Sequence, residues 1–356
     1  MRRKNSYRWG EKRIMDGENN NCPKVEEKKN NGWKRVKDLL KVLVSLVIIY
    51  VLIRNIGLEK IWLALKSTNL WILLLVLPIK LFSLLLNGVN ITLFLRAIDK
   101  KIRFWRIVVW SNLAWSIGLF FPGRVGEFSI IYFLKSEGVE FGESTAVALL
   151  DKMTTFFVLS VLSIIGVFYY FNFTSALWLA GILLIMMIGS VTIVLNARLR
   201  GLVKEYLLRK YARLFKGFND SFRRILGNRK MMLGNTLVTA VKWFFSFSSF
   251  SVIFLSLGAA VKVTDVMMIS SLATIISLIP ISMGGIGLRE YTAVYLFNGL
   301  GISPEITFVA YLLNTFINYI FASGIILANV HKINLEEIKR IRSKQSEWNN
   351  TEEHLG

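Results

Sequence analysis

The chain alternates between long apolar runs and short polar segments. The apolar runs are Leu39–Ile53, Leu70–Leu95, Ile107–Phe121, Thr145–Tyr170, Ser175–Asn196, Met232–Leu257, Val266–Ile281 and Ile306–Val330. A helix needs about 20 residues to cross the hydrocarbon core of a bilayer. Six of the eight runs can cross, although Leu39–Ile53 needs its flanks, while the runs ending at Pro122 and Pro280 are short and interrupted by Pro and Gly. The pattern predicts an all-α, multi-pass membrane protein.

The two interrupted runs end in versions of one motif. These are Pro122-Gly-Arg-Val-Gly-Glu127 and Pro280-Ile-Ser-Met-Gly-Gly-Ile-Gly-Leu-Arg-Glu290. Twenty-four positions after each glutamate, a polar residue follows Leu-Leu: Asp151 in the first copy and Asn314 in the second. A register kept over this distance indicates two copies of one structural unit. In a membrane protein, duplicated segments interrupted by Gly and Pro point to a transport site.

The distribution of charge decides between two topologies. The net charge is +21, from 44 basic and 23 acidic residues. Most of it falls in residues 1–41, 96–106, 198–230 and 331–344. If all eight runs cross, two strongly basic segments lie on opposite sides, against the positive-inside rule. We therefore expect six full spans and two re-entrant segments, with both termini cytoplasmic in the cell membrane; eight full spans are the alternative.

This topology has consequences for domain organisation. We expect a disordered basic tail (1–37), a membrane domain (38–332, with halves 38–172 and 175–332 and a basic loop 197–231) and a second tail (333–356). Three spans separate the motifs, so the copies enter from opposite faces, as in the inverted repeats of transporters. Non-helical backbone at membrane depth is tolerated where it is buried in protein or lines a wet cavity. Both motif loops should therefore line a cavity.

Two lysines stand inside apolar runs. Lys80 and Lys242 are 162 positions apart, against 163 for the motif glutamates, so they occupy equivalent places in the two halves. A lysine near mid-membrane costs about 2.5–3.5 kcal/mol on insertion scales. We expect both to face inward and to act in function; snorkelling to the membrane surface is the alternative.

A further charged pair lies early in the run that follows the first motif. Asp151 and Lys152 point about 100° apart on a helix, so they are not expected to pair with each other. Each could pair with Arg124 or Glu127, or form an interfacial pair near the helix end. The equivalent positions in the second half hold the uncharged Asn314 and Thr315.

The residue types of the motifs suit an anion site. Prolines end the preceding helices, and glycines allow tight turns and close backbone approach. Helix starts near Glu127 and Glu290, with an arginine beside each, would offer N–H groups and positive charge to a lipid phosphate. Alternatively, the glutamates cap helices and the arginines neutralise them. The candidate motif residues are Pro122, Gly123, Arg124, Gly126, Glu127, Pro280, Gly284, Gly285, Gly287, Arg289 and Glu290.

Several function classes are unsupported. Cys22 is the only cysteine, and the two histidines, His331 and His354, lie near or in the C-terminal tail. No disulfide framework, His-based zinc site or His-based catalytic triad is therefore expected. We expect no metal, no cofactor and no catalytic residue. Each basic block adjoins an apolar run, which favours contact with anionic lipid over nucleic acid.

At these motifs the chain resembles the lysylphosphatidylglycerol synthase transmembrane-region family, described as flippase-like integral membrane proteins. The resemblance covers about Val36 to Lys332 and includes Phe104-Trp105-Arg106 and Ala146-Val-Ala-Leu-Leu-Asp-Lys152. In multidomain members this region is similar to the part that moves aminoacylated phospholipid across the bilayer, before a cytoplasmic synthase domain. Only about 25 residues follow Val330, so the synthase activity is not expected here.

The resemblance also has a departure. Family members usually carry an arginine where this chain has Lys152, and an arginine is common where it has Thr315. Lysine keeps the charge but lacks the bidentate fork of arginine, so phosphate recognition there is expected to differ.

Together these observations predict a membrane protein that moves an anionic phospholipid or a polyprenyl-linked lipid between leaflets. Cationic side chains would bind the phosphate, and Glu127, Glu290 and Asp151 would hold the cations or exchange protons. The alternatives are a membrane-embedded transferase acting on a lipid phosphate and a non-transporting scaffold. The expected partners are membrane lipids, with a homo-oligomer left open. The expected cations are Lys80, Arg124, Lys152, Lys242 and Arg289.

Overall fold

The computed structural model describes residues 30–195, 217–277 and 285–330, and every regular element in these ranges is helical. Four segments of this part are long and apolar enough to cross a membrane: Leu70–Ala97, Phe141–Tyr170, Arg229–Ser256 and Pro304–Asn329. Shorter apolar helices cover Leu43–Ile56, Phe173–Gly189 and Val263–Ser277. These helices confirm the predicted all-α class. The elements are α1 Asn30–Ile56, α2 Leu58–Lys66, α3 Leu70–Leu74, α4 Val76–Ala97, α5 Phe104–Phe120, η1 Pro122–Ser129, α6 Ile130–Ser136, α7 Phe141–Tyr170, α8 Phe173–Leu195, α10 Phe218–Gly227, α11 Arg229–Ser256, α12 Val263–Ser277, α13 Leu288–Asn298 and α14 Pro304–Asn329.

The first helix begins earlier than the sequence predicts. The chain divides into two units at Lys37 and Asp38, close to the predicted start of the membrane domain. However, α1 begins at Asn30, so residues 30–37 are helical and not part of a disordered tail. Extending an existing helix adds one hydrogen bond per residue and needs no new nucleus, so polar residues can continue an apolar helix. All contacts described below lie within the second unit, Asp38–Gly356.

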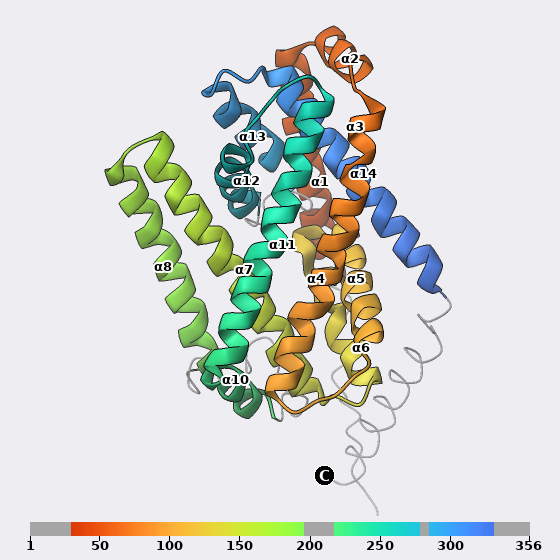
Figure 1. The fold of residues 1–356 in the computed structure, drawn as a ribbon, viewed down its shortest axis with the longest axis vertical. Helices are drawn as coiled ribbons and strands as arrows, with labels where there is room; N and C mark the ends of the chain where they lie inside the picture. Colours follow the sequence, from red (N-terminus) through yellow and green to blue (C-terminus); the bar gives the residue numbers. More distant parts are fainter. Residues whose placement is uncertain (1–29, 196–216, 278–284, 331–356) are drawn as a thin grey trace, which may run out of the picture. The chain divides into compact units, whose positions relative to one another are not determined.

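Helices α4 and α11 pack against each other in antiparallel orientation (Figure 1). The backbone N–H of Asn69, ahead of α4, donates to the carbonyl of Ser256, at the end of α11, over 2.7 Å. Further along, Asn90 donates to Thr239 Oγ1 (3.1 Å), and Asn235 donates to the Asn90 carbonyl (3.0 Å). These amides and the hydroxyl are buried and satisfy one another in part, which fixes the register of the two helices.

Helices α5 and α6 form a hairpin with the 3-10 helix η1 at its tip. Glu137, the residue after α6, accepts hydrogen bonds from Arg106 and Trp110 of α5, each over 2.9 Å. The start of α5 and the end of α6 therefore lie together, and the first motif turns at the far end of the hairpin. Pro122 lies at this turn. Because proline has no backbone N–H to donate, it ends α5.

Helices α12 and α13 pack together as the counterpart of this hairpin. Phe297 of α13 packs on Phe254 of α11, with ring centroids 5.0 Å apart, close to where α12 begins. In Figure 1, α6 lies at one end of the bundle and α13 at the other. Residues 278–284, which include Pro280 and Gly284, lie outside the described residues.

The packing of the two halves is reciprocal. Helix α5 of the first half packs against α14 of the second, and α12 of the second half packs against α7 of the first. Likewise α6 packs on α7, and α13 packs on α14. Two inverted copies of one unit would produce a reciprocal exchange of this kind.

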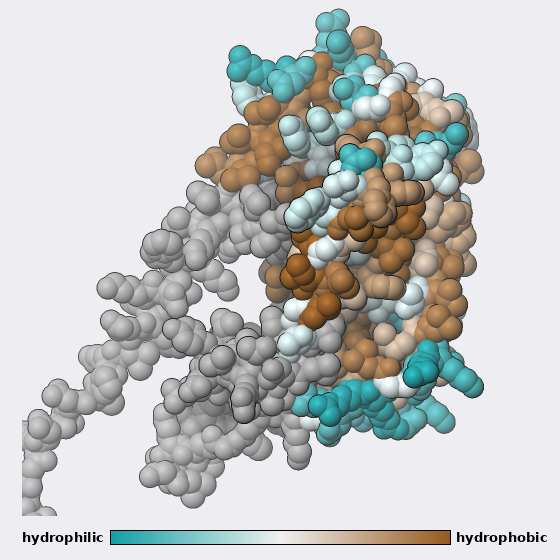
Figure 2. All heavy atoms as spheres, turned by 90° about the vertical axis from the view of Figure 1, so that its left-hand side faces the viewer, coloured by the Kyte–Doolittle hydropathy of each residue, from teal (hydrophilic) through white to brown (hydrophobic). Residues whose placement is uncertain are grey.

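The surface has an apolar zone between polar zones. Figure 2 shows polar side chains gathered at the top and bottom of one face and apolar side chains between them. On α8, Leu184 and Ile185 are exposed to 52% and 72% of their area. Contiguous apolar surface of this kind is unusual on a soluble monomer and suits contact with lipid chains.

Candidate functional site

Two glycines allow the first motif to lie directly on α5. A Cβ at Gly126 would stand 2.8 Å from the carbonyl oxygen of Ile117. A Cβ at Gly118 would stand 2.3 Å from Cγ of Glu127. Distances this short are not tolerated, so only glycine permits this approach. The close contact places the Glu127 carboxylate toward α7.

Replacing Gly118 with alanine should displace Glu127. We expect Gly118→Ala to lower the free energy of unfolding by about 1–3 kcal/mol, because overpacking forces side chains and backbone to shift. Thermal unfolding of the purified protein measures this change. Gly181→Ala on α8 is the matched control, because a Cβ there meets no atom within 4 Å. Equal stability of the two variants would contradict the close packing of η1 on α5.

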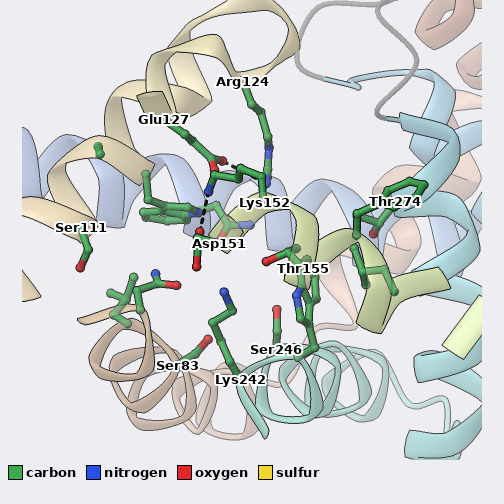
Figure 3. A pocket seen from close by; sticks show the side chains of 18 of the residues that line it. Ser83, Ser111, Arg124, Glu127, Asp151, Lys152, Thr155, Lys242, Ser246 and Thr274 are labelled. Carbon is green, nitrogen blue, oxygen red and sulfur yellow. Dashed lines mark hydrogen bonds and ion pairs between the residues drawn. The ribbon is translucent and has the colours of Figure 1, made fainter. Parts of the chain in front are cut away.

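The first motif and α7 form one ion-pair cluster (Figure 3). The Lys152 ammonium pairs with Glu127, and it also lies 3.2 Å from Asp151 Oδ2. Arg124 Nη1 lies 3.4 Å from Glu127 Oε1. Glu127 and Asp151 are 9% and 7% exposed, so both carboxylates depend on these partners. Burying these carboxylates without such partners would carry a large desolvation cost.

The pairing within α7 corrects one expectation. Adjacent helix positions were expected to keep Asp151 and Lys152 apart, yet their charged groups pair. The aspartate is short, but the four-carbon lysine stem is long enough to return its ammonium toward the neighbouring carboxylate. The expected contact between Lys152 and Glu127 is present as well.

The second motif uses its glutamate differently. Glu290 accepts a hydrogen bond from the Gly287 backbone N–H (2.6 Å) at the start of α13, and another from Arg289 Nη2 (2.7 Å). This is the helix-capping arrangement that was the alternative reading. It does not apply to Glu127, because α6 begins three residues later at Ile130. A helix was predicted to start near Glu127. Glu127 instead lies within the 3-10 helix η1, and the α-helix follows it.

The position equivalent to Lys152 also contacts its motif. Arg289 Nη2 donates to Thr315 Oγ1 over 2.7 Å. Both halves therefore join the motif to the following long helix at the same register, with Lys152 reaching Glu127 and Thr315 reaching Arg289. The halves differ in which motif residue makes the contact, Glu127 or Arg289, and in whether its partner on the long helix is charged.

Each motif has a residue with positive φ three positions before its glutamate. Arg124 has φ of 57°, and Gly287, which stands at the equivalent place before its glutamate, has φ of 89°. Glycine adopts positive φ freely, whereas an arginine there is strained. Gly285 also has positive φ and packs against Ser277. Pro122 and Gly123 form the start of η1.

These residues surround a cavity of about 330 Å³. Both predicted lysines line it, Lys80 from α4 and Lys242 from α11. Their position in the middle of a helix was expected from sequence spacing alone. Lys80 Nζ lies 5.3 Å from the ring centroid of Trp115, a cation–π contact. In Figure 3 the Lys242 side chain points toward Asp151. The predicted site residues that line the cavity are Lys80, Arg124, Glu127, Asp151, Lys152, Lys242, Arg289 and Asn314.

Several polar lining residues were missed by the sequence analysis. Ser83 and Asn87 follow Lys80 by one and two turns, and Ser246 follows Lys242 by one turn. Polar residues spaced by three, four and seven positions in an apolar helix form one stripe, and this spacing could have identified them. Others follow the same rule on α7 and α14: Thr155, Tyr311 and Asn318.

The helices and this cavity define a multi-pass membrane protein with a buried, charged cavity inside its helical bundle. A family model of the lysylphosphatidylglycerol synthase TM region matches residues 39–325, and the chain belongs to that family. The chain is also similar to a UPF0104 membrane protein of Methanothermobacter thermautotrophicus, with 22% identity over 312 residues. That match covers 79% of this chain and 89% of the relative.

Proposed function

We propose that this protein moves an anionic lipid between the two leaflets of the cell membrane. The observation that carries the proposal is the cavity, in which cationic residues from both halves meet between helices of membrane-spanning length. Ionisable groups inside a membrane bundle face a substrate or ion pathway in most known cases. The general lipid-related membrane role follows from the family; translocation is the proposal.

The mechanism follows from the reciprocal packing. The two motif loops lie on different halves, and each is joined to the long helix of its own half by a polar contact. Rocking of one half against the other would open the cavity alternately to each end of the bundle. At the α5–α14 contact, Tyr319 donates to the Leu119 carbonyl over 3.2 Å, and this contact would have to part.

We infer the topology of six spans and two re-entrant hairpins, with both termini cytoplasmic. The ion pairs Arg106–Glu137 and Lys100–Glu143, both of 2.9 Å, support it, because they hold the flanks of the α5–α6 hairpin together. In the eight-span alternative, the run 107–121 crosses the membrane once, and the start of α5 and the end of α6 would then lie on opposite sides.

Cysteine labelling distinguishes this topology from eight spans. In a Cys22→Ser background, we expect Lys101→Cys and Ser136→Cys to react with an impermeant thiol reagent from the same, cytoplasmic side. Lys262→Cys should react from outside, because it precedes the hairpin of opposite orientation. Eight spans would instead put the cysteines at positions 101 and 136 on opposite sides, and that result would overturn the proposal.

Transfer of fluorescent anionic lipid in reconstituted vesicles tests the function. Wild-type protein should speed transfer well above that in protein-free vesicles. The double variant Lys80→Met/Lys242→Met should lose most of this activity, because it removes two cations from the cavity lining. Transfer equal to that of empty vesicles would contradict the proposal, and an unaffected double variant would favour a different route for the lipid.

The pairing of the carboxylates favours transport over a transferase reaction. Glu127 and Asp151 both lie against Lys152, so neither stands free as a general base. A transferase would instead release product from a labelled lipid-linked sugar and lose that activity in Glu127→Gln. Absence of such product together with lipid transfer is the expected result.

A further inference from the structure

The cavity lining carries more positive than negative charge. Five cationic side chains and two carboxylates line it. Glu290 binds one of the cations, Arg289, from outside the lining. After every carboxylate is counted, two positive charges remain without a negative partner in the described part of the cavity.

Most of the cations are already neutralised. Lys152 and Arg124 pair with Glu127, and Lys152 also contacts Asp151. Arg289 is held by Glu290 and Thr315. The positive charges of these groups are therefore balanced by protein carboxylates, which lowers their net attraction for a further anion.

Lys80 and Lys242 differ from the other cations. Among the described residues neither forms an ion pair; Lys80 lies over Trp115, and Lys242 points toward Asp151 without pairing with it. Hydroxyl and amide groups stand one turn from each, at Ser83 and Ser246, with Asn87 a turn beyond Ser83. Ammonium groups with neighbouring hydroxyls suit phosphate oxygens, which accept several charge-assisted hydrogen bonds.

We propose that the cavity takes a lipid headgroup with two negative charges, held by Lys80 and Lys242. A terminal phosphomonoester fits, because it carries a charge of about −1.5 to −2 at neutral pH. A phosphodiester lipid with one charge would leave one lysine uncompensated in a buried site, which is unfavourable. This inference rests on the proposed lipid-binding role of the cavity and names the class of headgroup.

Native mass spectrometry of the full-length protein with defined lipids tests the inference without requiring transport. Phosphatidic acid, a phosphomonoester, should bind about tenfold more tightly than phosphatidylglycerol, which carries one charge. Phosphatidylcholine should bind more weakly than either. Equal binding of phosphatidic acid and phosphatidylglycerol would overturn the inference.

Charge removal at one lysine should change selectivity as well as affinity. With one excess charge left, Lys80→Met should lower the ratio of phosphatidic acid to phosphatidylglycerol binding by about tenfold. Lys80→Arg should keep the ratio of the wild type. Lys66→Met is the matched control, because Lys66 also lies over a tryptophan ring (5.6 Å) but is exposed and outside the cavity. A selectivity change in the control equal to that in Lys80→Met would overturn the assignment.

Two further results separate the possible explanations. Excess inorganic phosphate should displace phosphatidic acid only weakly, because the free ion lacks the lipid chains; complete displacement would show a phosphate site and overturn the lipid assignment. Selective binding without transfer in vesicles would support this inference and contradict translocation. Lipid transfer without selectivity for phosphatidic acid would support translocation and contradict this inference. The two proposals therefore fail on different results.

Discussion

Lys152→Met is expected to lower the free energy of unfolding by about 3 kcal/mol, because it leaves buried carboxylates without their shared cation. Glu127 would keep only Arg124 at 3.4 Å, and Asp151 would lose the ammonium now 3.2 Å away. The Lys152 side chain is 37% exposed, which places the cost at the lower end of the range for buried pairs. Thermal and denaturant unfolding in detergent micelles measure the change.

Two further variants identify the cause. Lys152→Arg should restore most of the stability, because it keeps the charge and offers the two carboxylates the planar donor fork of a guanidinium. The double variant Glu127→Gln/Lys152→Met should be more stable than the sum of the single effects predicts, since one carboxylate no longer lacks its partner. Wild-type stability in Lys152→Met would show that the cluster does not form.

Arg124→Gly and Arg124→Ala should have equal effects on transport and unequal effects on stability. Both remove a cavity cation, so lipid transfer should fall about tenfold or more. Arg124 has φ of 57°, a conformation that costs a non-glycine residue about 1–3 kcal/mol. Both variants lose the ion pair with Glu127. Glycine also removes the backbone strain, at the expense of a more flexible unfolded chain, whereas alanine keeps the strain.

Comparing the two variants therefore separates the effect of the lost charge on transport from the effect of backbone strain on stability. Arg124→Gly should be about as stable as the wild type, and Arg124→Ala should be less stable. The second motif already has glycine at the equivalent position, Gly287, with φ of 89°. A strained arginine where glycine would be easier indicates that the guanidinium is required there. Full transport by Arg124→Gly would remove that conclusion.

Spacing along the chain predicted much of the site. The lysines at positions 80 and 242 were expected to be equivalent and to face inward, and the structure places both in the cavity lining. A helix has a fixed period, so a polar residue in an apolar run marks a face even without coordinates. The same rule could have identified Ser83 and Ser246, which stand one turn away.

The roles of the two glutamates could not be predicted in this way. Glu127 and Glu290 occupy the same motif position, yet one pairs with Lys152 and the other caps α13. The difference depends on where each helix begins relative to the motif and on the approach of α5 at Gly118. Close approach between helices depends on side-chain volumes contributed by distant parts of the chain, which no local pattern contains.

The sequence by itself determined that this is an α-helical membrane protein with cations inside its apolar runs, and it predicted two related halves. Hydropathy and repeat spacing are properties of neighbouring residues, and they need no knowledge of packing. Only the tertiary structure decided which charges neutralise one another: Lys152 pairs with Glu127 and Asp151, whereas Lys80 and Lys242 line the cavity and form no ion pair among the described residues. Ion pairing depends on distances of a few ångströms between side chains from different helices, and those distances exist only after the halves have packed together.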